Sequence, residues 1–133
     1  MPARNRALAY QDQAVQTADG PRLLIMICDR LAADIDRAEM AIAQGNFEAG
    51  DENLQHAQRS IRMLASALDP NGFNGGNELM AVYSFIERHL VRANLEKSVA
   101  VVRECAELFR PIHEAWIGAV NLNERSGDVT HVG

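Results

Sequence analysis

Apolar residues recur at every third or fourth position along most of this chain, with polar residues between them. That spacing is typical of α-helices that bury one face. Glycine, proline and asparagine interrupt the rhythm and divide it into four long segments, which begin near Asp19, Asn46, Glu78 and Leu95. Because no segment alternates apolar and polar residues, the pattern predicts helices and no strands.

Short signals in the sequence indicate where these helices end. Gly45 tolerates the left-handed backbone conformation that commonly ends a helix. Pro70 ends the second helix, because the residue before a proline avoids helical dihedral angles. The glycine- and asparagine-rich residues 71–77 are predicted to form a loop. Pro111 lies inside the fourth helix and is expected to kink it, since it removes one backbone donor.

The lengths of the segments and of their connections indicate the fold. Helices of about 20 residues are roughly 30 Å long, and short connections make neighbouring helices antiparallel. We therefore expect an all-α fold, an antiparallel up-down four-helix bundle over residues 19–120. Residues 1–18 are expected to form an arm or a short extra helix that needs a surface to pack on, because a short isolated helix is marginal in water. The polar residues 121–133 are expected to be a disordered tail.

The first predicted helix carries more apolar residues than one buried face can use. Leu23 to Cys28 are six apolar residues in succession, and each residue turns the helix by about 100°. When Leu24 points into the core, Met26, Ala33 and Met40 point nearly the opposite way, one heptad apart. These three residues, the methionine stripe, are predicted to face solvent.

The fourth predicted helix has a second excess of apolar surface. Val101, Leu108 and Ile112 lie beside its core seam and widen its apolar arc to about half the circumference. Fully burying one methionine or leucine is worth about 1.5–3 kcal/mol, so several of them left in water make an adhesive surface. The plain alternative is that stray surface methionines are ordinary and that a broad apolar face marks a central helix.

Both surfaces, taken together with an apolar N-terminus, favour a groove that receives a foreign amphipathic segment. Leu8, Tyr10 and Val15 are the N-terminal residues that would cover part of this groove when no partner is bound. The predicted partner-binding residues are therefore these three, the methionine stripe, and Val101, Leu108 and Ile112.

Charge and composition narrow the location and the partners. A net charge of −5 argues against nucleic acids and anionic membranes as partners. No apolar run approaches the about 18 residues of a membrane span, and the N-terminus lacks the pattern of a signal peptide. We therefore expect a cytoplasmic protein without membrane insertion. Cys28 and Cys105 lie in apolar helical patterns and are expected to be buried free thiols.

No catalytic, metal-binding or cofactor-binding motif stands out. No glutamate is followed three residues later by histidine, the pattern of di-iron bundles. The chain has no CxxC or CxxCH motif and no glycine-rich phosphate loop. We expect neither cofactor nor metal, and no enzyme, because no nucleophile has a base at a suitable spacing. His113 is expected to be a hydrogen-bonded histidine in the interior or at the boundary of the core.

Short motifs spread over residues 10–116 keep a characteristic order and spacing. Near the N-terminus, Tyr10 is followed by Val15-Gln16-Thr17-Ala18 and then by Leu23, Met26 and Asp29. Downstream come Ala38, Ala41-Ile42, Ala57-Gln58, Ile61, Leu64, Leu68-Asp69, Leu79, Tyr83, Leu90, Ala93-Asn94 and Ala115-Trp116. In these motifs the chain resembles the flagellar secretion chaperone family, whose N-terminal pattern is Y…VxTAxP..L..MLYD. It departs from that pattern where Ile27-Cys28 replaces Leu-Tyr and where the proline, Pro21, is displaced by one position.

The resemblance implies a chaperone that binds the disordered C-terminal segment of flagellin, which folds into helices around the bundle. It further implies that binding prevents premature filament assembly. The loaded chaperone would then be recognised by the cytoplasmic domain of the membrane protein at the flagellar export gate. Because the chaperone would cover the apolar helical faces through which flagellin polymerises, occupancy alone would block assembly, without a nucleotide.

The residues leave two other functions open. Histidine phosphotransfer domains are also four-helix bundles, and His56 is the candidate phosphate acceptor. Such domains usually carry a lysine and then a glycine after that histidine, where this sequence has Arg59 and Ser60. The second alternative is a self-associating structural bundle. Whether the unloaded protein forms a homodimer through the same groove is also open.

Overall fold

The computed structural model describes residues 20–132, with side chains described as far as residue 125. Within that range the chain forms helices and no strand, and the helices follow in the order α2 (Gly20–Ala43), α3 (Phe47–Ala67), α4 (Gly76–Glu96) and α5 (Val99–Val132). The arm or short helix expected within residues 1–18 lies outside the described residues.

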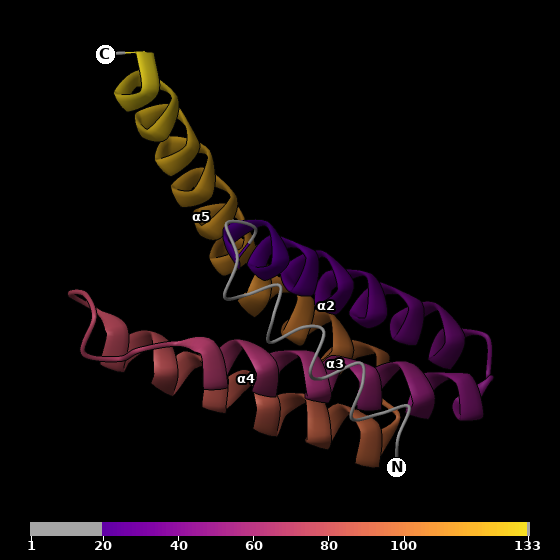
Figure 1. The fold of residues 1–133 in the computed structure, drawn as a ribbon. Helices are drawn as coiled ribbons and strands as arrows, with labels where there is room; N and C mark the ends of the chain where they lie inside the picture. The colour runs from indigo at the N-terminus through magenta and orange to yellow at the C-terminus, as the bar shows by residue number, and fades with distance from the viewer. Residues whose placement is uncertain (1–19, 133) are drawn as a thin grey trace, which may run out of the picture.

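Each helix packs on two of the other three. Helix α2 contacts α3 and α5, and α4 contacts the same two helices, so α2 lies diagonally opposite α4, and α3 opposite α5. Consecutive helices run in opposite directions (Figure 1). The predicted all-α, antiparallel four-helix bundle is confirmed.

The turn between α2 and α3 forms through two neighbouring residues. Gly45 has a φ of 80°, in the left-handed region that favours glycine. The side chain of Asn46 accepts a hydrogen bond of 3.2 Å from the backbone N–H of Ala49, which would otherwise lack a partner at the start of α3. Gly45 thus follows α2 in the conformation that the sequence indicates, and α3 begins next to Asn46, where the sequence places its start.

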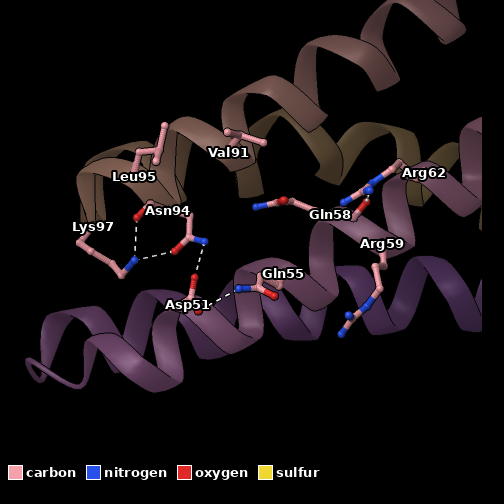
Figure 2. A pocket seen from close by; sticks show the side chains of 9 residues that line it. All are labelled: Asp51, Gln55, Gln58, Arg59, Arg62, Val91, Asn94, Leu95 and Lys97. Carbon is pink, nitrogen blue, oxygen red and sulfur yellow. Dashed lines mark hydrogen bonds between the residues drawn. The ribbon is translucent and has the colours of Figure 1, made fainter.

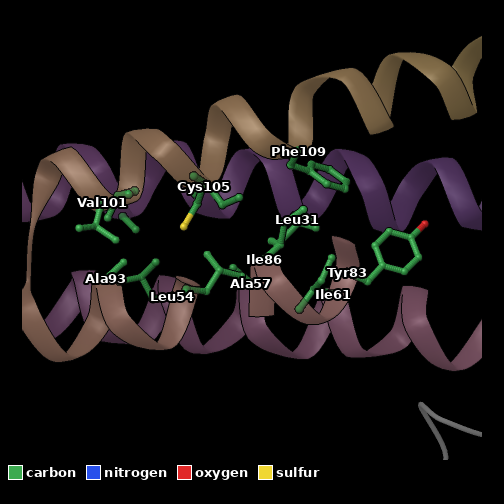
Figure 3. Packing of buried hydrophobic residues seen from close by; sticks show 14 of the residues in the cluster. Leu31, Leu54, Ala57, Ile61, Tyr83, Ile86, Ala93, Val101, Cys105 and Phe109 are labelled. Carbon is green, nitrogen blue, oxygen red and sulfur yellow. The ribbon is translucent and has the colours of Figure 1, made fainter. Parts of the chain in front are cut away.

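One continuous core lies along the axis of the bundle, and all four helices contribute to it. Leu31 of α2, Leu54 of α3, Ile86 of α4 and Phe109 of α5 are fully buried and belong to the same cluster of apolar side chains (Figure 3). The large ring of Tyr83 closes one end of that cluster in the same view. Burial on this scale is the main source of stability of such a bundle.

The C-terminal part of α5 differs from the prediction. The polar residues 121–133 predict a disordered tail, but α5 continues through Pro111 and remains helical to Val132. Its last part rises away from the other helices (Figure 1). The side chains of residues 121–125 are exposed, and no proline follows Pro111 to stop the helix. Residues 121–125 therefore form a helical segment that has no buried face.

Gly76, the first residue of α4, lies directly against the loop that precedes the helix. A Cβ atom added there would collide with the backbone carbonyl of Pro70. Because the obstacle is backbone, it cannot give way as the end of a flexible side chain can. The close approach of the loop to α4 therefore requires glycine at this position.

Gly76→Ala should lower the free energy of unfolding by about 1–3 kcal/mol, since the loop must shift. The control is Gly118→Ala on the exposed side of α5, where nothing lies within 4 Å of an added Cβ atom. Alanine favours a helix over glycine by about 1 kcal/mol, so the control should be neutral or stabilised. Urea unfolding measures both variants. Equal changes in the two would contradict the close approach.

The core holds two free cysteines, Cys28 of α2 and Cys105 of α5, as the sequence indicates. Burial, helped by the neighbouring carboxylates of Asp29 and Glu104, raises the pKa of each thiol to about 12. The thiolate, which is the reactive form, is therefore suppressed in the folded protein.

Neither thiol should react with an aromatic disulfide reagent in the native protein at mildly alkaline pH, and both should react in urea. The folded state holds these protons more tightly than the unfolded chain, so their contribution to stability is complete below pH 9.0 and is lost as the pH rises towards 12. Rapid modification of a thiol in the folded protein would contradict this burial.

Candidate functional site

The methionine stripe lies on the outer face of α2. Met26 and Met40 are each 64% exposed, and Ala33 between them is half-buried. Exposed charged residues flank the stripe, with Asp29 and Asp36 among them. The stripe is thus a narrow apolar line in a polar surface, a feature that marks interaction sites when it is continuous.

On α5 the structure corrects one predicted binding residue. Val101 is only 4% exposed and belongs to the core cluster, so it offers no surface to a partner. Leu108 and Ile112 are half-buried and pack against the core. The reason is that α5 touches both α2 and α4, which together cover a wider arc than the predicted seam.

Exposed apolar residues of α4 were not indicated by the sequence pattern. Phe85 is exposed and stacks on the ring of His89, with 5.5 Å between the ring centroids. His89 in turn lies 2.7 Å from the carboxylate of Glu104 on α5. Val82, one turn before Phe85, is exposed as well. The sequence does carry a signal for both residues, because Val82 and Phe85 are apolar and yet lie outside the line of core positions on α4.

Trp116 separates two clefts at the end of the bundle where α2 begins. Its indole N–H donates a hydrogen bond of 2.9 Å to the hydroxyl of the buried Tyr83, which links α5 to α4. On one side lies an apolar cleft of about 370 Å³, the Trp116 groove, lined by Pro21, Leu23, Leu24, Ile27, Ala67, Ala119 and Val120, among others. On the other lies a cleft of about 200 Å³ against the loop before α4. The helical periodicity of the sequence gave no sign of these clefts.

A larger groove of about 540 Å³ between α3 and α4 is polar (Figure 2). Asn94 donates a hydrogen bond of 2.7 Å to Asp51, and Gln55 donates one of 2.9 Å to the same carboxylate. These two hydrogen bonds lower the pKa of Asp51, and the bond from Asn94 has the larger effect. Lys97 has a left-handed backbone conformation, and its ammonium group donates to the Asn94 carbonyl and side chain. Because Asn94 lies on α4 and Asp51 on α3, the hydrogen bond between them connects the two helices along this groove.

The histidines occupy different surroundings. His113 of α5 lies 2.7 Å from the carboxylate of Asp29 on α2 and stacks on Phe109, so it is a bonded histidine at the core boundary, as expected. His56 is half-buried and lines a cavity between α2 and α3. In residues 20–125, no three histidine, cysteine, aspartate or glutamate side chains are placed to hold a metal ion.

The predicted binding residues thus fall into three groups. Met26, Ala33 and Met40 lie together along α2, and Leu108 and Ile112 lie on α5. Leu8, Tyr10 and Val15 lie outside the described residues. No helix between residues 20 and 132 combines the length and the apolar character needed to cross a membrane.

Bundle and surface together define an all-α four-helix bundle with exposed methionines and apolar clefts on its outer faces. The family model described as "Flagellar protein FliS" matches residues 3–123. The chain belongs to this FliS family.

Individual relatives agree with the family model. The chain is 29% identical over 125 residues to the flagellar secretion chaperone FliS of Bacillus subtilis (strain 168), covering 94% of this chain and 93% of that protein. It is 30% identical over 107 residues to the flagellar secretion chaperone FliS of Escherichia coli (strain K12), with 79% of each protein covered. The fold matches a solved structure described as a flagellar chaperone from bacteria, with a TM-score of 0.69, 18% identity, and 87% of this chain and 98% of that chain covered.

Replacing both exposed methionines, Met26→Glu together with Met40→Glu, should leave the helix content and melting temperature nearly unchanged. Surface substitutions typically alter the free energy of unfolding by about 0.5 kcal/mol or less. The control is Val101→Glu, which places a charge in the core and should lower stability by about 3 kcal/mol or more. Circular dichroism during heating distinguishes the two. Unfolding of the double methionine variant would show that the stripe is core.

Proposed function

We propose that the protein is a cytoplasmic export chaperone for flagellin. It binds the C-terminal segment of flagellin, prevents the premature polymerisation of flagellin, and delivers flagellin to the flagellar type III export gate. There the cytoplasmic domain of the gate's membrane protein recognises the loaded complex. The observation that carries the proposal is membership of the FliS family, whose matched relatives are named flagellar secretion chaperones.

The methionine stripe supports this function because its dimensions suit a helix. Met26 and Met40 are fourteen residues apart on α2, and a rise of 1.5 Å per residue separates them by about 21 Å, or roughly four turns. An amphipathic helix of the client that lies along α2 covers both methionines at once. Charged residues on both sides, among them Asp36 and Arg37, fix its direction through complementary charges.

Binding alone accounts for the chaperone activity in this proposal. Flagellin assembles through apolar helical faces, so a client whose faces lie on the bundle cannot join a filament. Each methionine that becomes fully buried contributes about 1.5–3 kcal/mol, and release of the client at the gate needs only competition for the same surface. No nucleotide takes part.

The N-terminal residues form the second element of the proposal. Leu8, Tyr10 and Val15 cover the Trp116 groove in the unloaded protein and leave it when the client arrives. The groove begins at Gly20, the first residue of α2. The five residues from Val15 to Gly20 span at most about 16–18 Å when extended, which is enough to turn back onto the groove. A second copy of the chain is the alternative occupant.

The test of the proposal is complex formation between the full chain and the C-terminal segment of flagellin from the same organism. Size exclusion with light scattering should show a stoichiometric complex. Met26→Glu with Met40→Glu should weaken the complex at least about tenfold, as expected from lost apolar burial. The matched control is Ala81→Glu on α4 with Ala100→Glu on α5, two exposed positions away from the stripe and the clefts, which adds the same charge.

Two outcomes would contradict the proposal. Absence of any complex, together with phosphorylation of His56 by a phosphodonor, would establish the phosphotransfer alternative. A homodimer that excludes the flagellin segment at all concentrations would favour a self-associating structural bundle.

A further inference from the structure

Asp34 of α2 is a buried carboxylate whose hydrogen bonding is incomplete. It is 1% exposed and lies among the core residues of its helix. Its Oδ1 atom accepts a hydrogen bond of 3.2 Å from Arg37, but its Oδ2 atom has no hydrogen-bond partner. Arg30 approaches Oδ2 only to 3.5 Å. A buried carboxylate oxygen without a donor is costly and uncommon, so this atom points to a missing donor.

The carboxylate lines a cavity of about 350 Å³ between α2 and α3. Apolar residues form one part of the lining, namely Leu23, Met26, Ile27 and Met63, and polar residues form the other, namely Arg30, Asp34, His56, Arg59 and Ser60. Met26 belongs to the methionine stripe, so the cavity is continuous with the proposed path of the client helix. The Arg30 side chain, which forms an ion pair with Oδ2, is 63% exposed, so solvent screens this pair.

The charges around the cavity restrict which donor fits. A cationic side chain would meet Arg30 and Arg59, and an anionic one would meet Asp34. A neutral group that both donates and accepts suits the site, because Arg59 and Ser60 offer donors beside the acceptor Oδ2. The primary amide of asparagine or glutamine is such a group, and its methylene carbons would rest against Met26 and Met63.

We propose that this cavity is a subsite of the client-binding surface that takes the primary amide of an asparagine or glutamine side chain from the bound helix. The amide N–H donates to Oδ2 of Asp34, and the amide oxygen accepts from Arg59 or Ser60. The inference rests on the proposed function, since the bound helix is that of the flagellin segment. The subsite adds register to the apolar stripe, because an amide can bond to Asp34 at only one position along α2.

The first measurement is the affinity of the flagellin C-terminal segment for Asp34→Asn, a variant of the same shape without the carboxylate. Titration calorimetry should show binding weakened about 10- to 100-fold, the factor expected for a hydrogen bond to a charged group. Glu107→Gln on the exposed side of α5 changes the charge equally and should bind like the unaltered chain. Asp34→Asn also loses the ion pairs with Arg30 and Arg37, so circular dichroism during heating accompanies the titration and shows that the variant is folded.

The second measurement separates direct contact from a structural effect. Each asparagine and glutamine of the flagellin segment is replaced by alanine in turn, and each variant is titrated against the unaltered chain and against Asp34→Asn. One amide should weaken binding to the unaltered chain about tenfold or more, yet change binding to Asp34→Asn less than about twofold. A change in folding alone would not produce this coupling.

The results distinguish this inference from the proposed function. If the unaltered chain binds the flagellin segment but Asp34→Asn binds equally well, or if no amide couples to Asp34, the subsite is disproved and the chaperone function stands. If the unaltered chain binds no flagellin segment at all, the proposed function fails and the subsite fails with it.

Discussion

Each helix of this bundle has only two neighbours, so only the arc that faces them can be buried. On α2 that arc faces α3 and α5, and the residues on the opposite side, Met26 and Met40, stay in water however apolar they are. The geometry of four antiparallel helices therefore explains how the folded chain carries a line of exposed methionines. In the proposed function this line has a physical use, because the helix of a client would supply the neighbour that α2 lacks.

The same constraint explains which parts of the site the sequence predicts. Helical periodicity gives the angle of each residue about the axis of its own helix, so it placed the two methionines of the stripe on the exposed side of α2. It does not give the angles between helices. Val101 was therefore expected at the surface, although α2 and α4 together cover it. The Trp116 groove was invisible for the same reason, since its lining comes from helices far apart in the sequence.

Asp34 was missed for a different reason. Its position, three residues after the buried Leu31, is that of a core residue, but its charge suggests the surface. In the structure Asp34 is buried, as its position in the helix indicates, and one of its carboxylate oxygens has no hydrogen-bond donor. Apolar burial along α2 would give the client affinity, whereas a polar group of this kind would give register. Without a polar group such as Oδ2 of Asp34, an apolar surface alone would bind a client helix without selecting its register.

The most direct test of the account measures the solvent exposure of the Met26 and Met40 methyl groups by NMR. A soluble nitroxide added to the sample broadens the signals of the methyl groups that it can reach. In the free monomer both signals should broaden, because both side chains are largely exposed. On addition of the flagellin C-terminal segment both should become protected, while the half-buried Met80 on α4, diagonally opposite α2, changes less. Methyl groups already protected in the free monomer, or still accessible in the saturated complex, would contradict the claim that α2 keeps an unpartnered apolar face for its client.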